Sequence, residues 1–313
     1  MKNIYFYILL PVFLLHQTDS RATDLSLQGA INNTYTACGQ IFTNIYDAYS
    51  KQQFSVALGA IGTGLSAGGT IAGGIGLAQN KEHDKLREEL SDTHKQVKTL
   101  KSEETTYTKP VDNSQEIQNL NTQKKELKRE LKYISDSVHT STTTSFGLLV
   151  PAFFANTIAT ILGATNANIE KELATNMQNC IDAVSIIPAA QVQYKLETGA
   201  DNSDTLYVKS QNIINTCGQY DVSKLQKIKQ YSVAGTIANA VSAAGALTGG
   251  SLMMAGAADN KNNMMTAGTA IGGVSTAASA TGVALNAAQL QLVKELSKIT
   301  EQCAYALEYK FSE

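Results

Sequence analysis

The chain has 313 residues and a formal net charge of −2, and only 17% of its residues are charged, against roughly 25% in a typical soluble domain. Hydrophobic residues make up 43% of it, a composition that excludes a disordered protein, and the balanced charge gives no basic surface for nucleic acid. We therefore expect a folded chain with no nucleic-acid partner.

Residues 1–22 have the pattern of a secretory signal peptide. Lys2 supplies the positive start, residues 4–15 form an apolar run, and residues 20–22 offer a small-residue exit. The run is shorter than the roughly 20 residues that span a bilayer, although a retained membrane anchor is the alternative interpretation. The pattern predicts an exported protein, located in the periplasm, the cell envelope or the secreted fraction.

Four sequence landmarks occur twice in the same order, which indicates a tandem duplication. The matched segments are 38–40 and 217–219, 53–57 and 230–234, 80–81 and 260–261, and 171–173 and 294–296. We predict module one over residues 23–190, a linker over residues 191–212 around the turn former Gly199, and module two over residues 213–313.

The cysteines number four, an even count that suggests two disulfides in an exported protein. Each module begins and ends with one of them, so pairing Cys38 with Cys180 and Cys217 with Cys303 repeats one design twice. The two cross pairings would break the symmetry of the duplication, and four buried free thiols are the remaining alternative. We predict the pairing within each module.

Each module contains two stretches without a single Asp, Glu, Lys or Arg. They cover residues 52–80 and 140–169 in module one and residues 232–258 and 262–293 in module two. Strands are disfavoured because hydrophobic residues do not alternate and Ala is frequent, so we expect helices. A short polar turn at 259–263 then makes module two an antiparallel helical hairpin.

Module one has a charged insertion, residues 81–139, in place of that turn. Its apolar residues recur at steps of three and four, with Thr93 and Lys124 completing the pattern, as in the seam of a coiled coil. The seam residues are Leu86, Leu90, Val97, Leu100, Ile117, Leu120, Leu127, Leu131, Ile134 and Val138. A turn signal at 108–113 predicts that the two arms fold back as an antiparallel stalk.

Glycine pairs spaced four residues apart lie within the uncharged stretches, and this spacing places both glycines on one helix face. The pairs are Gly64 and Gly68, Gly69 and Gly73, Gly245 and Gly249, and Gly268 and Gly272. Because Gly costs about 1 kcal/mol relative to Ala inside a helix, so many glycines indicate close helix packing.

Two features point in opposite directions on whether the uncharged stretches lie in a membrane or in water. The absence of charge favours a membrane, because a helix facing solvent normally carries charges. A stripe in the last stretch favours a soluble packed coil, with steps of three and four. Its members are Ile271, Val274, Ala278, Thr281, Leu285, Ala288 and Leu292.

No catalytic motif is present in the sequence. The phosphate loop, the nucleophile elbow and the paired-histidine zinc motif are all missing. We interpret His83, His94 and His139 as solvated positions of the stalk rather than metal ligands. We expect no enzyme activity, no cofactor, no metal and no small-molecule substrate.

The sequence thus predicts an all-α protein made of two tandem disulfide-closed antiparallel hairpins. These would pack like a four-helix bundle, with the first hairpin extended by a coiled-coil stalk. The expected function is that of a structural or assembly protein of the cell envelope. It would self-associate through Gly/Ala faces as a homo-oligomer, or dock another envelope protein at the stalk. The alternatives are a pore-forming or translocator protein and a soluble secreted binding module.

Overall fold

The computed structural model describes residues 26–106 and 113–309. Five helices and no strand occur in these ranges, so the predicted all-α class is confirmed. The helices are α1 (Leu27–Thr106), α2 (Ser114–Thr198), α3 (Thr205–Cys217), α4 (Val222–Ala258) and α5 (Asn262–Ala306). The predicted signal peptide and nearly all of the predicted turn at 108–113 lie outside the described residues.

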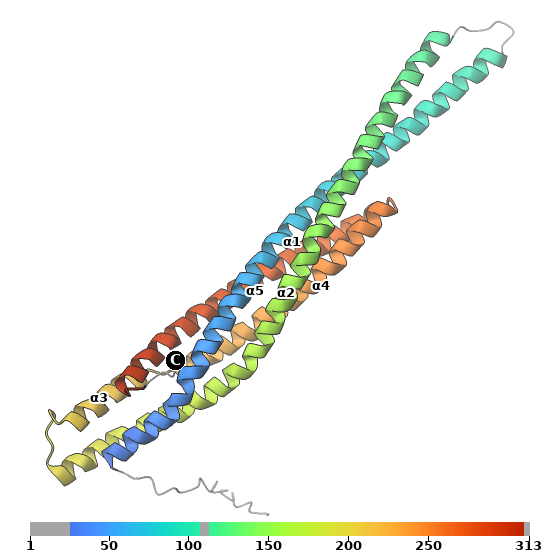
Figure 1. Cartoon of the computed structure of the whole chain (residues 1–313). Coiled ribbons are helices and arrows are strands. Elements are labelled where there is room, and N and C mark those ends of the chain that lie inside the picture. Colours follow the sequence, from blue (N-terminus) through green and yellow to red (C-terminus); the bar gives the residue numbers. More distant parts are fainter. Residues whose placement is uncertain (1–25, 107–112, 310–313) are drawn as a thin grey trace, which may run out of the picture.

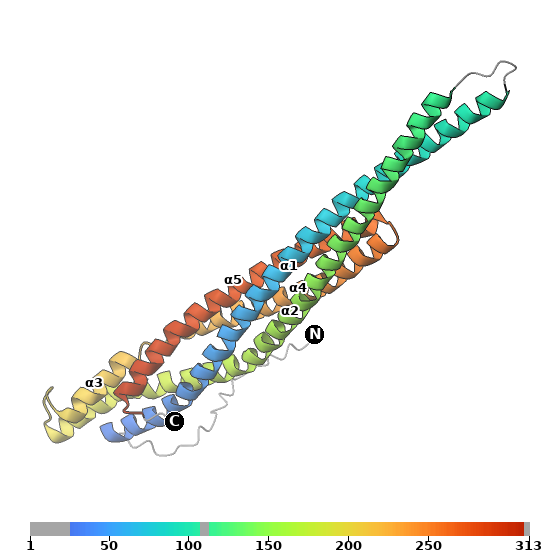
Figure 2. The ribbon, with the colours of Figure 1, turned by 45° about the horizontal axis from the view of Figure 1, so that its top comes forward.

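The two longest helices, α1 and α2, lie side by side and antiparallel (Figures 1 and 2). The shorter α4 and α5 form a second antiparallel pair that packs against the first, and α1 and α2 continue beyond the turn between α4 and α5. We name three tiers along this molecule. The head comprises residues 27–51, 170–231 and 294–309, the uncharged tier comprises residues 52–80, 140–169, 232–258 and 262–293, and the stalk comprises residues 81–106 and 113–139.

The head has an ordinary hydrophobic core. Its largest fully buried side chains are Leu27, Ile41, Phe42, Ile45, Leu173, Met177, Ile187, Ile213 and Ile228. Disulfides Cys38–Cys180 and Cys217–Cys303 lie within this core, and both join the cysteines that the repeat pairs within a module. Each bond closes a long loop, which is worth about 4 to 5 kcal/mol in the chain-entropy view.

Most of the predicted linker, residues 191–212, is helical. Helix α2 continues to Thr198 and ends at Gly199, whose φ of 68° lies in the left-handed region that glycine adopts readily. Asp204 then caps α3 by accepting hydrogen bonds from the backbone of the first turn. Within the predicted linker, only residues 199–204 are non-helical. Helix α3 packs back on the end of α2, where Gln191 donates to Ser210 over 2.6 Å.

The stalk is formed by the two charged arms of α1 and α2. Its predicted seam is shielded: Val97, Leu127, Ile134 and Val138 are buried, and the other seam residues are partly buried between exposed neighbours. Polar contacts also join the arms, including one of 2.8 Å between Lys124 Nζ and His94 Nδ1. The three-four periodicity therefore marks the face on which the two arms meet.

Glycines let the helices of the uncharged tier approach closely. A Cβ atom added to Gly249 would lie 2.9 Å from the carbonyl oxygen of Gly268, and one added to Gly268 would lie 2.7 Å from that of Gly249. Gly245 and Gly272 also meet atoms of other helices, as do Gly68, Gly69 and Gly73 on α1. Gly64 is the exception among the predicted packing glycines: it is exposed and would meet nothing within 4 Å.

This packing predicts opposite effects of one substitution at two glycines of α5. Gly268→Ala should lower the free energy of unfolding by about 1–3 kcal/mol, because its methyl group would collide with the backbone of α4. Gly273→Ala should have no effect, or add up to about 1 kcal/mol, because nothing lies within 4 Å of the new methyl group. Thermal unfolding followed by circular dichroism measures both, and equal losses would contradict the helix contact.

Candidate functional site: the uncharged tier

The uncharged tier has a polar interior. Its buried side chains are small or carry amide and hydroxyl groups, and only a few are large and apolar, such as Leu149 and Met253. The buried polar residues are Gln52, Ser55, Ser66, Asn80, Thr142, Ser145, Asn156, Asn166, Ser232, Asn239, Ser242, Ser275, Ser279, Asn286 and Gln289. All four long helices contribute to this set, so a polar spine runs through the tier.

The exterior of the same tier is apolar. On α1, for example, Phe54 is 67% exposed, and on α4 Ile237 is 58% exposed. The other large exposed apolar side chains of the tier are Ile61, Ile71, Ile75, Phe154, Ile158, Ile161, Val233, Val241, Leu247, Met254 and Val274. Burying one such side chain is worth about 1.5–3 kcal/mol, so this surface is strongly favoured to leave water.

The stripe of α5 that steps by three and four is not the face of this helix that packs inward. Val274, a member of that stripe, is 61% exposed, and Thr281 is exposed as well. Between Met265 and Val293, the buried line of α5 consists instead of small and polar residues, namely Gly268, Gly272, Ser275, Ser279, Gly282, Asn286 and Gln289. The stripe does not mark the packed face because backbone proximity at glycines and hydrogen bonds between polar side chains, rather than apolar burial, decide which face of α5 turns inward.

Hydrogen bonds join the helices across the middle of the polar spine. The Asn156 amide of α2 donates to Ser242 of α4 over 3.0 Å, and Ser279 of α5 donates to the Asn156 side-chain oxygen over 3.1 Å. Thr63 of α1 lies 2.8 Å from Ser279, hydroxyl to hydroxyl. One network therefore connects all four helices, and each bond is strengthened by the exclusion of water.

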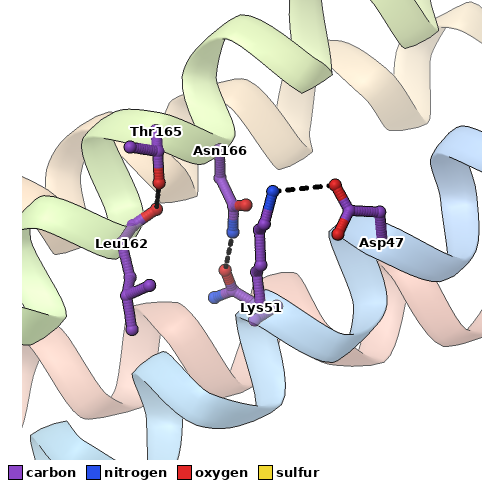
Figure 3. A network of polar contacts seen from close by, with 6 residues as sticks. Asp47, Lys51, Leu162, Thr165 and Asn166 are labelled. Carbon is purple, nitrogen blue, oxygen red and sulfur yellow. Dashed lines mark hydrogen bonds and ion pairs between the residues drawn. The ribbon is translucent and has the colours of Figure 1, made fainter.

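A second network lies where the tier meets the head (Figure 3). The Asn166 amide of α2 donates to Gln52 Oε1 of α1 over 3.2 Å, and Gln52 Nε2 donates to the carbonyl oxygen of Asn286 on α5 over 3.1 Å. The adjacent Lys51 pairs with Asp47 over 2.7 Å. The charged side chains of the head therefore begin directly next to this network.

The stalk end of the tier is joined by a third set of polar contacts. Asn80 of α1 donates to Asn262 of α5 over 2.9 Å, and Asn262 in turn donates to Asp84. Next to them His83 and His139 line a cavity of about 290 Å³. The His83 side chain is only 16% exposed, so the expectation that it is solvated is wrong, because α2 and the end of α4 lie against it at the junction of tier and stalk.

Glu170 is a buried acidic residue that the sequence reading did not single out. It is 7% exposed, and its Oε1 accepts a hydrogen bond of 2.6 Å from Gln289, while Oε2 has no hydrogen-bond partner. Burial raises the pKa of Glu170 to about 7, against the opposing effects of Ser232, Gln289 and Lys229. No sequence motif surrounds Glu170, so only its burial between the packed helices distinguishes it from the other acidic residues.

Comparison with protein-family models, with curated proteins and with solved structures finds no match.

Glu170 should make the stability of the fold depend on pH. Between pH 4.5 and about 7 the folded chain retains a proton on this carboxyl that the unfolded chain has lost, so the free energy of unfolding should fall as pH rises. Glu170→Gln should remove this dependence and stabilise the protein at pH 8 by about 2 to 3 kcal/mol, with no effect at pH 4. Thermal unfolding across this pH range measures it.

Glu172→Gln is the matched control, because Glu172 is an exposed neighbour on the same helix. It should leave the slope of stability against pH unchanged. If the slope were the same in Glu170→Gln as in the unaltered chain, the assignment of this carboxyl would be wrong.

Proposed function

We propose that the protein is a non-enzymatic structural or assembly protein of the cell envelope and that its uncharged tier spans a lipid bilayer. The observation that carries this proposal is the inverted polarity of the tier, with amide and hydroxyl side chains inside and Phe, Ile, Val and Leu side chains outside. In water such an arrangement is unfavourable, whereas in a bilayer the apolar side chains face lipid tails and most of the polar ones pair within the bundle, with Asn239 as an exception.

The dimensions of the tier support the proposal. Three described segments are long and apolar enough to cross a membrane, within Leu27–Glu103, Ser114–Thr198 and Thr205–Ala258. The four uncharged stretches have 27 to 32 residues, or about 40 to 48 Å of helix, against a hydrocarbon core of about 30 Å. The close glycine contacts are also typical of helix packing in membranes, where small residues bring backbones together.

A bilayer around the tier would place the head and the stalk on opposite sides. The head contains both disulfides, so it belongs on the exported side, where disulfides persist. The stalk segment, residues 81–139, holds 12 of the 25 Lys and Arg residues and belongs on the other side, in agreement with the positive-inside rule. The stalk is then the part available for docking another envelope protein.

We do not propose that the chain self-associates through its glycine faces. Gly249 and Gly268 contact each other within one chain, and Gly73 and Gly272 meet Met253 of the same chain, so these faces are covered. A homo-oligomer would have to form through the apolar exterior or through the stalk.

A second candidate function is pore formation, and the polar spine is the observation that favours it. If the helix pairs separated in a target membrane, Asn156, Asn239 and Ser242 would supply a hydrophilic lining. Release of a trapped dye from liposomes by the purified protein would support this candidate. Stable insertion without release supports the structural role.

The membrane proposal predicts how lysine substitutions on the outer surface affect bilayer binding. Phe154→Lys, at the midpoint of the uncharged stretch 140–169 and 57% exposed, should reduce recovery with liposomes in a flotation assay, because Lys costs about 2.5–3.5 kcal/mol at the centre of a membrane helix. Tyr133→Lys is the control, since Tyr133 is 76% exposed on the stalk, and it should float as the unaltered chain does.

The soluble binding module predicts the opposite outcome. For a bundle that lies in water, an exposed lysine at position 154 would leave the protein in the soluble fraction and improve its solubility. Extraction of the unaltered protein from membranes by alkaline carbonate would also contradict bilayer insertion.

A further inference from the structure

The two disulfides of the head lie next to each other. The Sγ atoms of Cys38, Cys180 and Cys303 all lie within 4.8 Å of one another, although these residues belong to two different disulfides on three different helices. All four cysteines are fully buried in the hydrophobic core of the head. Cys303 therefore faces both sulfurs of the module-one disulfide as well as its own partner, Cys217.

We infer that this sulfur cluster is a thiol–disulfide exchange site, in which Cys303 can transfer its bond from Cys217 to a cysteine of module one. The contact geometry carries the inference, because once one disulfide has been reduced, the exchange step itself needs only a thiolate next to a disulfide sulfur. The inference does not depend on the proposed membrane location.

The reaction starts when a dithiol reductant opens the Cys217–Cys303 bond. The reductant supplies two electrons, becomes a disulfide itself, and leaves a thiol on Cys217 and a thiolate on Cys303. The Cys303 thiolate then attacks Cys180 Sγ, so that a Cys180–Cys303 bond forms, the Cys38–Cys180 bond breaks, and Cys38 leaves as a thiolate that takes up a proton. Attack on Cys38 Sγ gives a Cys38–Cys303 bond and frees Cys180 in the same way.

The fold indicates which disulfide a reductant reaches first. Cys217 is the last residue of α3, which is the shortest helix at 13 residues. Grooves lined by Asn212, Asn215 and Tyr305 run along the boundary between α3 and α5. Cys38 and Cys180, in contrast, lie within α1 and α2, which have 80 and 85 residues. A local opening of α3 exposes its disulfide while the remainder of the head stays packed.

The consequence is a change in which parts of the chain are covalently joined. In the starting state each disulfide lies within one module, and only the backbone at 199–204 connects the modules. After exchange, Cys303 of α5 is bonded to α1 or α2, so the two modules are cross-linked. The site is thus a redox-controlled link between the two halves of the head.

The full-length variant Cys217→Ser tests the exchange without a reductant, because it leaves Cys303 as a free thiol beside the Cys38–Cys180 bond. After incubation at pH 8, acid quenching and alkylation, peptide mapping should find at least a tenth of the label on Cys38 or Cys180, together with the corresponding Cys303 bridge. Label on Cys303 alone would overturn the inference.

Cys303→Ser is the matched control, because it leaves the free thiol on Cys217, whose Sγ is not one of the three mutually close sulfur atoms. Its label should stay mainly on Cys217. Equal scrambling in the two variants would show that exchange follows unfolding and would also overturn the inference.

If Cys217→Ser does not fold, the unaltered protein treated with less than one equivalent of a dithiol gives the same readout. It should form a bridge from Cys303 to Cys38 or Cys180, and finding only the original bonds would count against the exchange.

Discussion

The placement of hydrogen-bonding side chains inside the uncharged tier is the constraint on which the other features of this molecule depend. Amide and hydroxyl groups such as those of Asn156, Ser242 and Ser279 satisfy one another only if four helices meet at fixed heights along their axes. Polar contacts are directional, so they set the register between helices more strictly than apolar packing does. The glycines serve the same constraint, because short polar side chains reach across the interior only where the backbones are close.

The three tiers are stabilised by different interactions. The head uses a conventional apolar core around Phe42 and Met177, reinforced by two covalent bonds. The stalk uses a single apolar seam between two helices, and its charged surface keeps it solvated. The uncharged tier has neither an extensive apolar core nor a charged surface. The same chain thus contains two regions built for water, separated by one whose surface suits hydrocarbon.

Sequence patterns predicted the structure correctly wherever a single physical rule determined it. Uncharged stretches with frequent Ala specify helices, and the steps of three and four locate Val97, Leu127 and Ile134 on the shielded face of the stalk. The repeated sequence landmarks predict the pairs Cys38–Cys180 and Cys217–Cys303, which are the two bonds of the structure. The rule that apolar residues turn inward failed on α5, where Val274 points outward and Ser275 inward. That rule presupposes an aqueous surround, and the sequence does not state the solvent.

Glu170 could not be predicted from the sequence because its burial arises from tertiary packing. The helices on both sides of residues 199–204 likewise depend on tertiary contacts, such as that of Gln191 with Ser210.

The position of the Cys38–Cys180 bond makes module one a covalent ring of more than a hundred residues, since the bond spans 142 positions of sequence. The stalk is the part of that ring that lies farthest from the disulfide. A protease that cut the stalk once would therefore open the ring without releasing a fragment, and the two pieces would stay joined through the head until the disulfide was reduced. The molecule can lose the continuity of its outermost segment and still keep its two long helices anchored at the same point.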